Sequence, residues 1–245
     1  DRFAVGFSVR ILEGDKAAKY LNSPETLLFN KSALLYGLQQ AKNKIREADY
    51  SILVEGQFDL LLAHQVGFVN TVAGSGTAIT EQHLKTLKRF SNRIILAFDP
   101  DAAGWAAADR AARLALALGM EVKAALLPEG SDPAAYIAEY GGGRFGTLLK
   151  NAKYIIDFHL NLVMAGAKDG RALAQGVKEK ILPYIALLES RIDQAQYVKQ
   201  VAGATLIKED AIWEDLRRIK PDRNAGEKSS EKKLQRLLRR NAIER

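Results

Sequence analysis

Short apolar runs alternate with stretches of helical periodicity from residue 51 onward, and few folds accommodate such an alternation. The expected strands cover residues 52–54, 69–73, 93–98 and 122–127, and the expected helices cover residues 58–66, 80–90, 102–118 and 134–139. Strands that alternate with helices across short connections form a parallel sheet, with right-handed crossovers and with helices on its faces. The sequence therefore predicts an α/β fold built on a four-stranded parallel sheet.

Acidic residues follow three of these expected strands. Glu55 follows the first strand, Asp99 and Asp101 follow the third, and Asp132 comes after the fourth. Ligands of parallel sheets bind outside the carboxyl ends of the strands, so these side chains are expected at one edge. Asp59, one helical turn beyond Glu55, is expected to face the same point. Carboxylates gathered in this way repel one another unless a cation joins them, and Mg²⁺ prefers such oxygen ligands.

Helix capping is the alternative interpretation of these acids. Asp101 stands immediately before the expected helix 102–118, and Asp132 precedes Pro133, a residue type that favours the first helical position. Capping is the better explanation for any one of the acids taken alone. Metal binding is the better explanation for the whole set, because capping by itself does not account for acids at three strand ends.

Motifs at these positions resemble the topoisomerase-primase (Toprim) domain, which primases, topoisomerases and some nucleases share. They are the run ILVEG at residues 52–56, followed by Asp59, and the run FDPDAAG at residues 98–104. Within that group, three further runs resemble bacterial DNA primases of the DnaG type: KYLNSPET at residues 19–26, LYGL at residues 35–38 and PEGSDP at residues 128–133. The resemblance covers about residues 1–218.

The resemblance implies synthesis of short RNA primers on single-stranded DNA for replication, by two-metal nucleotidyl transfer. It implies that three acids hold the main metal ion and take part in catalysis: Glu55, Asp99 and Asp101. It assigns weaker support of a second metal ion to Asp59 and Asp132, and nucleotide or template binding to Arg10, Lys19 and Lys31. The implied cofactor is Mg²⁺ or Mn²⁺. Zinc is not expected, because the chain has no cysteine.

The chain departs from the primase pattern at two places near these residues. Ala134 stands where the family often has a second acid, directly after the Asp-Pro pair, and this weakens the expected hold on a second metal ion. Ser8 and Val9 precede Arg10 where primases commonly have a glycine, and this change leaves the arginine in place.

The implied partners are a single-stranded DNA template, ribonucleoside triphosphates and, through the full-length protein, a replicative helicase and a single-strand-binding protein. The implied location is the bacterial cytoplasm, at replication forks of the nucleoid. No apolar run approaches the roughly 20 residues of a membrane helix, so no membrane partner is expected. The chain is expected to be a piece of a longer protein, able to bind metal and nucleotide but to synthesise little RNA.

Four segments are expected along the chain. Residues 1–47 are expected to be the α+β remnant of an N-terminal basic subdomain, with a helix over residues 32–47. The later segments are the Toprim metal-binding domain over residues 48–147, an all-α subdomain over residues 148–219 and a basic linker over residues 220–245. Nine basic and four acidic residues in the linker supply most of the net charge of +7, so charge alone does not predict nucleic-acid binding by the earlier segments.

Two other functional classes stay open on the sequence. One is a different Toprim enzyme, a topoisomerase or a metal-dependent nuclease, although no motif indicates a tyrosine nucleophile. The other is a nucleic-acid-binding module with a vestigial metal site.

Two further sequence features do not indicate a functional site. Residues 141–146 have the glycine spacing of dinucleotide-binding loops, but they follow a helical stretch rather than a strand. The histidines show no ligand spacing and are expected to pack or to lie on helix surfaces: His64, His83 and His159.

Overall fold

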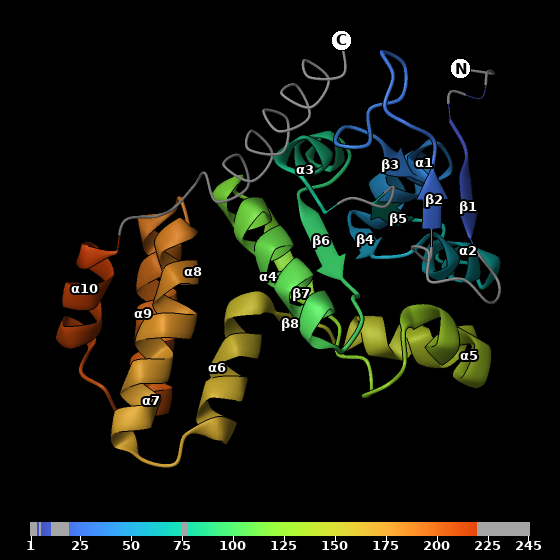
Figure 1. The fold of residues 1–245 in the computed structure, drawn as a ribbon. Helices are drawn as coiled ribbons and strands as arrows, with labels where there is room; N and C mark the ends of the chain where they lie inside the picture. The colour runs from blue at the N-terminus through green and yellow to red at the C-terminus, as the bar shows by residue number, and fades with distance from the viewer. Residues whose placement is uncertain (1–3, 5, 11–19, 75–77, 220–245) are drawn as a thin grey trace, which may run out of the picture.

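The structure is a computed structural model that describes residues 4, 6–10, 20–74 and 78–219 (Figure 1). Its centre is a six-stranded sheet in the order β3-β5-β4-β6-β7-β8. The four inner strands are parallel, as predicted: β5 (Thr71–Gly74), β4 (Ser51–Val54), β6 (Arg93–Leu96) and β7 (Glu121–Ala124). The edge strands β3 (Leu35–Tyr36) and β8 (Lys153–Tyr154) are antiparallel to their neighbours, so the sheet is mixed and wider than predicted.

Helices cover both faces of the sheet, because successive residues of a strand point to opposite sides. One face, which includes Leu53 and Leu96, shares a buried core with α1 (Leu38–Ala48), α3 (Glu81–Lys88) and α4 (Ala102–Ala117). The other face, which includes Ile52 and Val54, shares a core with α2 (Gln57–Gln65) and α5 (Pro133–Lys150). The helices α2 to α5 each follow an inner strand, as the alternation predicts.

The predicted helix over residues 32–47 is wrong at its start. α1 begins at Leu38, and the preceding residues form a turn and the short strand β3. Gly37 stands before the helix with a φ of +79°, and a Cβ at this position would lie 2.5 Å from Leu60 Cδ1, so glycine is required. Upstream, β1 (Ser8–Arg10) and β2 (Tyr20–Asn22) form the antiparallel pair of the expected α+β part.

Helix α5 is longer than predicted: the expected helix ended at residue 139, and α5 continues to Lys150. A kink at Gly141, with a φ of 74° and a ψ of 170°, joins its two helical parts. Residues 141–146 therefore lie within a helix, where no dinucleotide-binding loop exists. Phe145 in this run is completely buried and packs edge-on against Phe68, with the ring centroids 5.2 Å apart.

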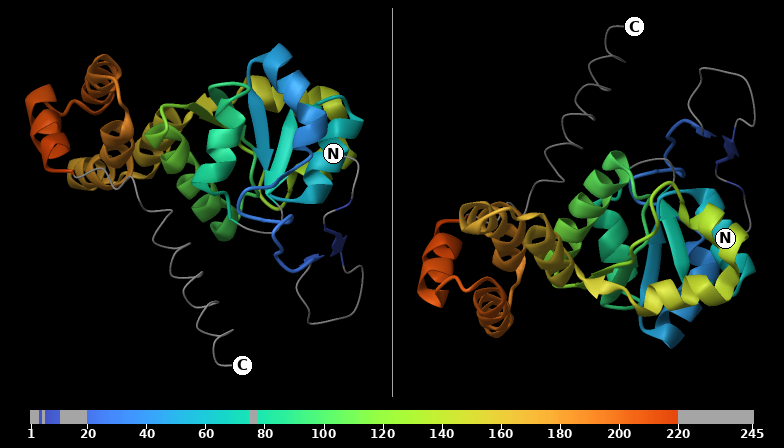
Figure 2. Two further views of the ribbon diagram at one scale, coloured as in Figure 1. Left: turned by 90° about the horizontal axis from the view of Figure 1, so that it is seen from above. Right: turned by 90° about the horizontal axis from the view of Figure 1, so that it is seen from below.

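Beyond β8 the described chain is helical, as predicted. The elements are α6 (Ile155–Gly166), α7 (Gly170–Gly176), the π-helical segment η1 (Val177–Ile181), α8 (Leu182–Leu187), α9 (Arg191–Thr205) and α10 (Glu209–Arg218). Pro183 lies in the first turn of α8, directly after η1, which confirms the break predicted at this proline. Figures 1 and 2 show these helices to one side of the sheet, beyond α4.

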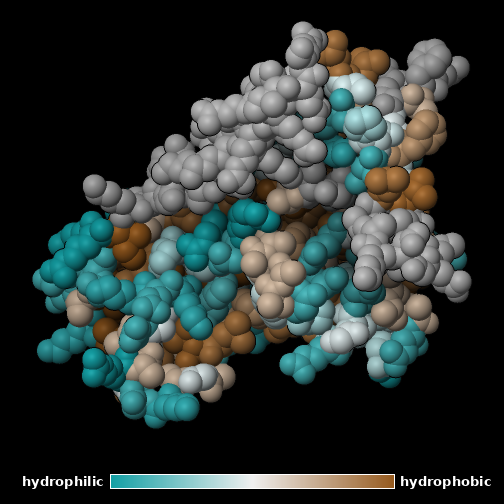
Figure 3. Space-filling view, viewed as in Figure 1, coloured by the Kyte–Doolittle hydropathy of each residue, from teal (hydrophilic) through white to brown (hydrophobic). Residues whose placement is uncertain are grey.

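Apolar side chains reach the surface over the loop between β2 and β3, where Leu27 and Leu28 are exposed (Figure 3). Among the helices that the structure describes, none has the length and apolar character needed to cross a membrane. The predicted basic linker over residues 220–245 lies outside the described residues. The division into four segments stays a prediction, and the sheet takes β3 and β8 from outside residues 48–147.

Candidate active site

Two of the strand-end loops that carry acids are joined directly. Glu55 follows β4, and Asp99 stands three residues beyond the end of the neighbouring strand β6. The Asp99 backbone N–H donates a hydrogen bond to Glu55 Oε1 at 3.1 Å. Because adjacent parallel strands end at the same edge, residues 44 positions apart in the chain meet here. The structure therefore brings Glu55 to the loop of Asp99 and Asp101, as the sequence predicts.

Gly104 makes this approach possible, and the sequence analysis did not single it out. A Cβ at residue 104 would lie 2.2 Å from the Asp99 carbonyl oxygen and 2.6 Å from Glu55 Oε1. Any larger residue in this first turn of α4 would therefore displace the Glu55 carboxylate or the Asp99 loop. A signal was present in the sequence, because glycine inside an alanine-rich helix costs about 1 kcal/mol relative to alanine and calls for a packing reason.

Asp59 ties two helix N-termini together at the same edge. Its side chain is 6% exposed, and its Oδ2 accepts a hydrogen bond from the Gly56 N–H at 2.9 Å. Its Oδ1 accepts a second hydrogen bond from the Ala134 N–H at 3.0 Å, across 75 residues of chain. Ala134 is the position where primases often have an acid, and here its backbone holds Asp59. Asp59 thereby fixes the start of α5, and with it Asp132, relative to the start of α2.

The capping interpretation is confirmed for the two remaining acids. Asp101 Oδ1 accepts a hydrogen bond from the Gly104 N–H at 2.7 Å, and Asp132 Oδ1 accepts one from the Ala135 N–H at 2.6 Å. Among the described residues, the second carboxylate oxygen of each makes no hydrogen bond. Capping and metal binding are therefore compatible at both positions, since the cap uses one oxygen of each carboxylate.

The electrostatics of the edge show that these carboxylates share one field. The pKa of the Glu55 carboxyl is raised from 4.5 to about 7, mainly by burial and then by the negative charge of Asp99. The charges of Asp101 and Asp59 raise it as well, whereas the hydrogen bond from the Asp99 N–H lowers it. Burial also raises the pKa of Asp59 from 3.8 to about 6, with Asp132 and Asp99 adding to the effect. Bound positive charge at this edge would relieve the repulsion.

The donor chemistry of the edge fits Mg²⁺ or Mn²⁺. All five acids offer hard carboxylate oxygens, and Mg²⁺ typically takes one or two carboxylates together with waters and substrate phosphate. Within the described ranges, no three His, Asp or Glu side chains already stand close enough together to enclose an ion. The edge is thus an open arrangement that would leave coordination positions for water and substrate, and not a closed cage.

The histidines contribute nothing to this edge, in agreement with the packing interpretation. The Nε2 atom of His64 lies 2.9 Å from the Thr71 carbonyl oxygen, and His83 caps the start of α3. His159 stacks on Tyr184, with the ring centroids 4.5 Å apart.

The structure describes the three predicted basic residues unequally. Arg10 closes β1, where its backbone pairs with Tyr20, and its side chain is outside the description. Lys19 lies outside the described residues altogether. The carbonyl oxygen of Lys31 lies 2.9 Å from His83 Nε2, and this contact holds the Lys31 backbone against the first turn of α3. Their nucleotide-binding roles stay predictions.

Trp105 is a second feature of the edge that the sequence analysis missed. It follows Gly104 in the first turn of α4, is 39% exposed and lines a small cavity with Asp99 and Pro100. Its ring stacks on Phe158 of α6, with the centroids 5.4 Å apart and an interplanar angle of 15°. A partly exposed aromatic ring, stacked on Phe158, therefore stands next to Asp99.

The fold and the acidic edge define a Toprim-like protein, and the family comparison agrees. The family described as Toprim-like matches residues 52–137, and the family described as the N-terminal domain of the DNA primase catalytic core matches residues 2–42. The chain belongs to the DnaG-type bacterial DNA primases.

Individual relatives support this membership. The DNA primase of Clostridium acetobutylicum is 37% identical over 213 residues, which cover 86% of this chain and 35% of that protein. A solved DNA primase domain from Pseudomonas aeruginosa is 31% identical, with a TM-score of 0.75, and the match covers 87% of this chain and 68% of that domain. A solved DnaG primase catalytic domain bound to ssDNA is 30% identical, with a TM-score of 0.72 and coverage of 84% and 67%.

The chain spans only part of the length of its curated relatives. The share is 35% for the Clostridium acetobutylicum primase and 47% for the Aquifex aeolicus primase. Primases with a Toprim domain use divalent metal ions in general. The activity and the partners of a whole primase are therefore matters of proposal for this chain.

Proposed function

We propose that this chain carries out the joining of ribonucleotides into short RNA primers on a single-stranded DNA template, at the low rate expected for a piece of a longer protein. The observation that carries the proposal is the contact between Glu55 and the Asp99 loop, which gathers carboxylates from separate strand ends at one edge. Membership of the DnaG-type primases supports the reaction, and the relative solved with ssDNA supports the template.

Glu55, Asp99 and Asp101 would hold the main divalent ion, Mg²⁺ or Mn²⁺. When bound, such an ion lowers the pKa of the attacking 3′-hydroxyl and screens the charge of the α-phosphate and the departing pyrophosphate. The Asp99 N–H orients Glu55 Oε1, and the Asp101 cap fixes the first turn of α4. These contacts hold the carboxylates in place before the substrate arrives.

Asp59 and Asp132 would support a second ion more weakly. Both Asp59 oxygens already accept backbone hydrogen bonds, so this residue would act mainly by positioning Asp132 and Glu55. Arg10, Lys19 and Lys31 would pair with triphosphate or template phosphates, because their charges complement these groups. By analogy with the family, the whole protein would work in the cytoplasm with a replicative helicase and a single-strand-binding protein.

The test is RNA synthesis from ribonucleoside triphosphates on single-stranded DNA in the presence of Mg²⁺ or Mn²⁺. We expect Glu55→Gln, Asp99→Asn and Asp101→Asn each to lower the rate by about 100-fold or more, because each removes charge that the metal requires. Asp210→Asn is the matched control, since Asp210 is an exposed acid on α10, far along the chain from this edge.

Full activity in all three variants would refute the proposed role of the edge. Supercoiled plasmid incubated under the same conditions should stay intact, and nicking or relaxation would instead indicate the chemistry of another Toprim enzyme. Thermal unfolding of each variant is measured in parallel, so that a loss of fold is not counted as a loss of chemistry.

A further inference from the structure

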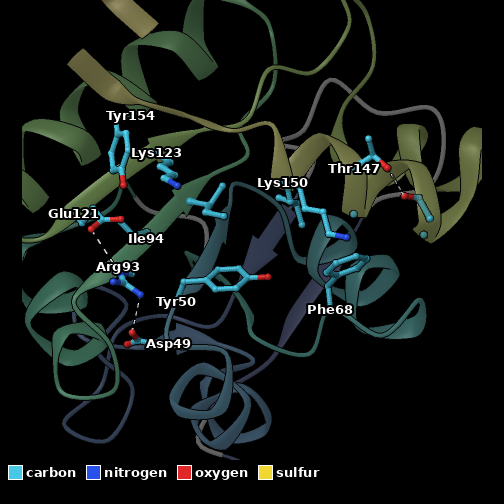
Figure 4. Close-up of a pocket in the computed structure, with 15 residues that line it drawn as sticks. Asp49, Tyr50, Phe68, Arg93, Ile94, Glu121, Lys123, Thr147, Lys150 and Tyr154 are labelled. Atoms are coloured by element: carbon cyan, nitrogen blue, oxygen red, sulfur yellow. Dashed lines mark hydrogen bonds and ion pairs between the residues drawn. The ribbon is translucent and has the colours of Figure 1, made fainter. Parts of the chain in front are cut away.

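A second pocket, with a cavity of about 580 Å³, lies at the opposite edge of the sheet from the acids (Figure 4). Asp49 and Tyr50, which precede β4, and Arg93 and Glu121, which begin β6 and β7, all line it. This is the edge at which the parallel strands begin, their amino ends. The candidate metal ligands lie at the other edge, after the carboxyl ends of the strands. A four-residue strand, roughly 13 Å long, therefore separates the two places.

Aromatic rings and glycines form the walls of this pocket. Tyr50, Phe68 and Tyr154 line it, and Figure 4 shows the Tyr50 hydroxyl directed toward the side of the pocket that holds Phe68 and Lys150. Phe68 is held in place by its edge contact with Phe145. Gly143 of α5 also lines the pocket, and a Cβ added there would meet no atom within 4 Å. Gly143 thus leaves open space beside flat apolar surfaces.

The pocket lining holds three cations and two acids, a net charge of +1, and both acids are paired with the same cation. Arg93 is paired with both acids of the lining, at 2.8 Å from Asp49 and at 3.6 Å from Glu121. Lys123 Nζ lies 4.5 Å from the centroid of the Tyr154 ring. Within the described part of the chain, neither Lys123 nor Lys150 forms a salt bridge with an acid. An anionic group would therefore complement both lysines.

We propose that this pocket binds a nucleoside phosphate, whose base lies against the aromatic walls and whose phosphate pairs with Lys123 and Lys150. The cavity volume lies in the range of small-molecule sites, and a mostly apolar lining with a few charged groups is typical of them. A simple inorganic anion would leave the three rings unused, and an uncharged aromatic ligand would leave the two ammonium groups unused. Ammonium groups of the lining would hold the phosphate directly, so this binding needs no metal ion.

Independence from metal separates this pocket from the acidic edge in an experiment. Binding of GMP, GTP and inorganic phosphate to the whole chain is measured by isothermal titration calorimetry in buffer with EDTA. We expect one nucleotide per chain, with inorganic phosphate at least about tenfold weaker. Lys123→Ala and Lys150→Ala should each weaken the binding of nucleotide about tenfold, as the loss of one charge-assisted contact predicts.

Two controls make the result specific. Lys153→Ala removes an exposed lysine of β8 that does not line the pocket, and it should leave the affinity unchanged. Asp99→Asn should also leave binding in EDTA unchanged, whatever it does to RNA synthesis. The proposal is overturned if the wild type binds no nucleotide in EDTA, if neither lysine substitution weakens binding, or if inorganic phosphate binds as tightly as GMP.

Discussion

At the scale of single residues, Glu55 shows how burial and neighbouring charge act on one carboxyl group. Its pKa of about 7 in the folded protein lies above the ordinary 4.5, so the folded state keeps a proton that the unfolded chain has lost. The stability contributed by this group is complete below pH 4.5 and is lost as the pH rises through 7. Without metal, we therefore expect Glu55 to lower the free energy of unfolding over this interval.

Urea unfolding of the metal-free wild type and of Glu55→Gln between pH 5 and pH 8 measures this effect. The variant should be relatively more stable at pH 8 than at pH 5, and it should lose most of the stabilisation that added Mg²⁺ gives the wild type. The comparison is necessary because burial lowers the pKa of His159 to about 4, which works in the opposite direction. An equal difference between the two proteins at both pH values would contradict the assignment.

Gly104 provides a second prediction at this scale. Alanine normally stabilises a helix by about 1 kcal/mol relative to glycine, but here its methyl group would collide with the Asp99 carbonyl and Glu55 Oε1. We expect Gly104→Ala to destabilise the protein by about 1–3 kcal/mol and to weaken its response to Mg²⁺. Gly203→Ala in α9 is the matched control, since a Cβ there meets nothing within 4 Å and should be neutral or stabilising.

The residues of the site differ in how far the sequence could predict them. Glu55 and Asp99 could be expected to meet because both follow strands of one parallel sheet, and the helix starts at Asp101 and Asp132 follow from ordinary capping chemistry. Gly104 and Trp105 could not be placed in this way. Their roles depend on how closely α4 approaches β4 and α6, and this distance is a property of packing.

At the scale of elements, α4 connects the acidic edge to the helical part of the chain. It begins at the Asp101 cap, and two turns later Asp109 accepts hydrogen bonds from the Tyr184 hydroxyl of α8 and, at 2.9 Å, from Arg113 Nε. Arg113 also lies over the Tyr184 ring, 4.5 Å from its centroid. The helix α8 is thereby fastened to the same helix that presents the Asp101 carboxylate.

Tyr184→Phe tests this connection. Removing the hydroxyl leaves Asp109 with one donor fewer in a half-buried place, so we expect a loss of about 1–2 kcal/mol in the free energy of unfolding. Tyr197→Phe is the control, because among the described residues the Tyr197 hydroxyl has no hydrogen-bond partner. The free energy of unfolding of both variants is measured by chemical denaturation. Equal free energies of unfolding for Tyr184→Phe and Tyr197→Phe would contradict the role of Tyr184 in holding α8 to α4.

The elements also show where sequence patterns stop being informative. The inner strands β4, β5 and β6 are largely apolar, whereas β7 alternates apolar and charged residues, and the prediction of all four strands is confirmed. The edge strands β3 and β8 are two residues long, too short for any periodicity, and they exist because Leu35 pairs with Gly74 and Ala124 pairs with Lys153. The helix expected over residues 32–47 begins only after Gly37, which has a positive φ and lies too close to Leu60 of another helix to carry a Cβ.

At the scale of the whole molecule, the two edges of the sheet carry opposite chemistry. The carboxyl ends of the strands gather acids suited to a cation, and the amino ends hold a pocket whose unpaired charges are lysines. A nucleotide could therefore bind at either edge, with metal at the first and without it at the second. We expect Lys123→Ala and Lys150→Ala to weaken the nucleotide binding that is measured in EDTA. We expect Asp99→Asn to weaken only the additional binding that is measured in Mg²⁺.

The most direct test of the acidic edge is anomalous X-ray diffraction from crystals of the protein soaked in Mn²⁺. We expect an anomalous peak about 2–2.5 Å from carboxylate oxygens of Glu55 and of Asp99 or Asp101, and its loss in crystals of Asp99→Asn. Mn²⁺ found only elsewhere on the protein, or an edge without any ion at a saturating concentration, would contradict the claim that these carboxylates hold the metal.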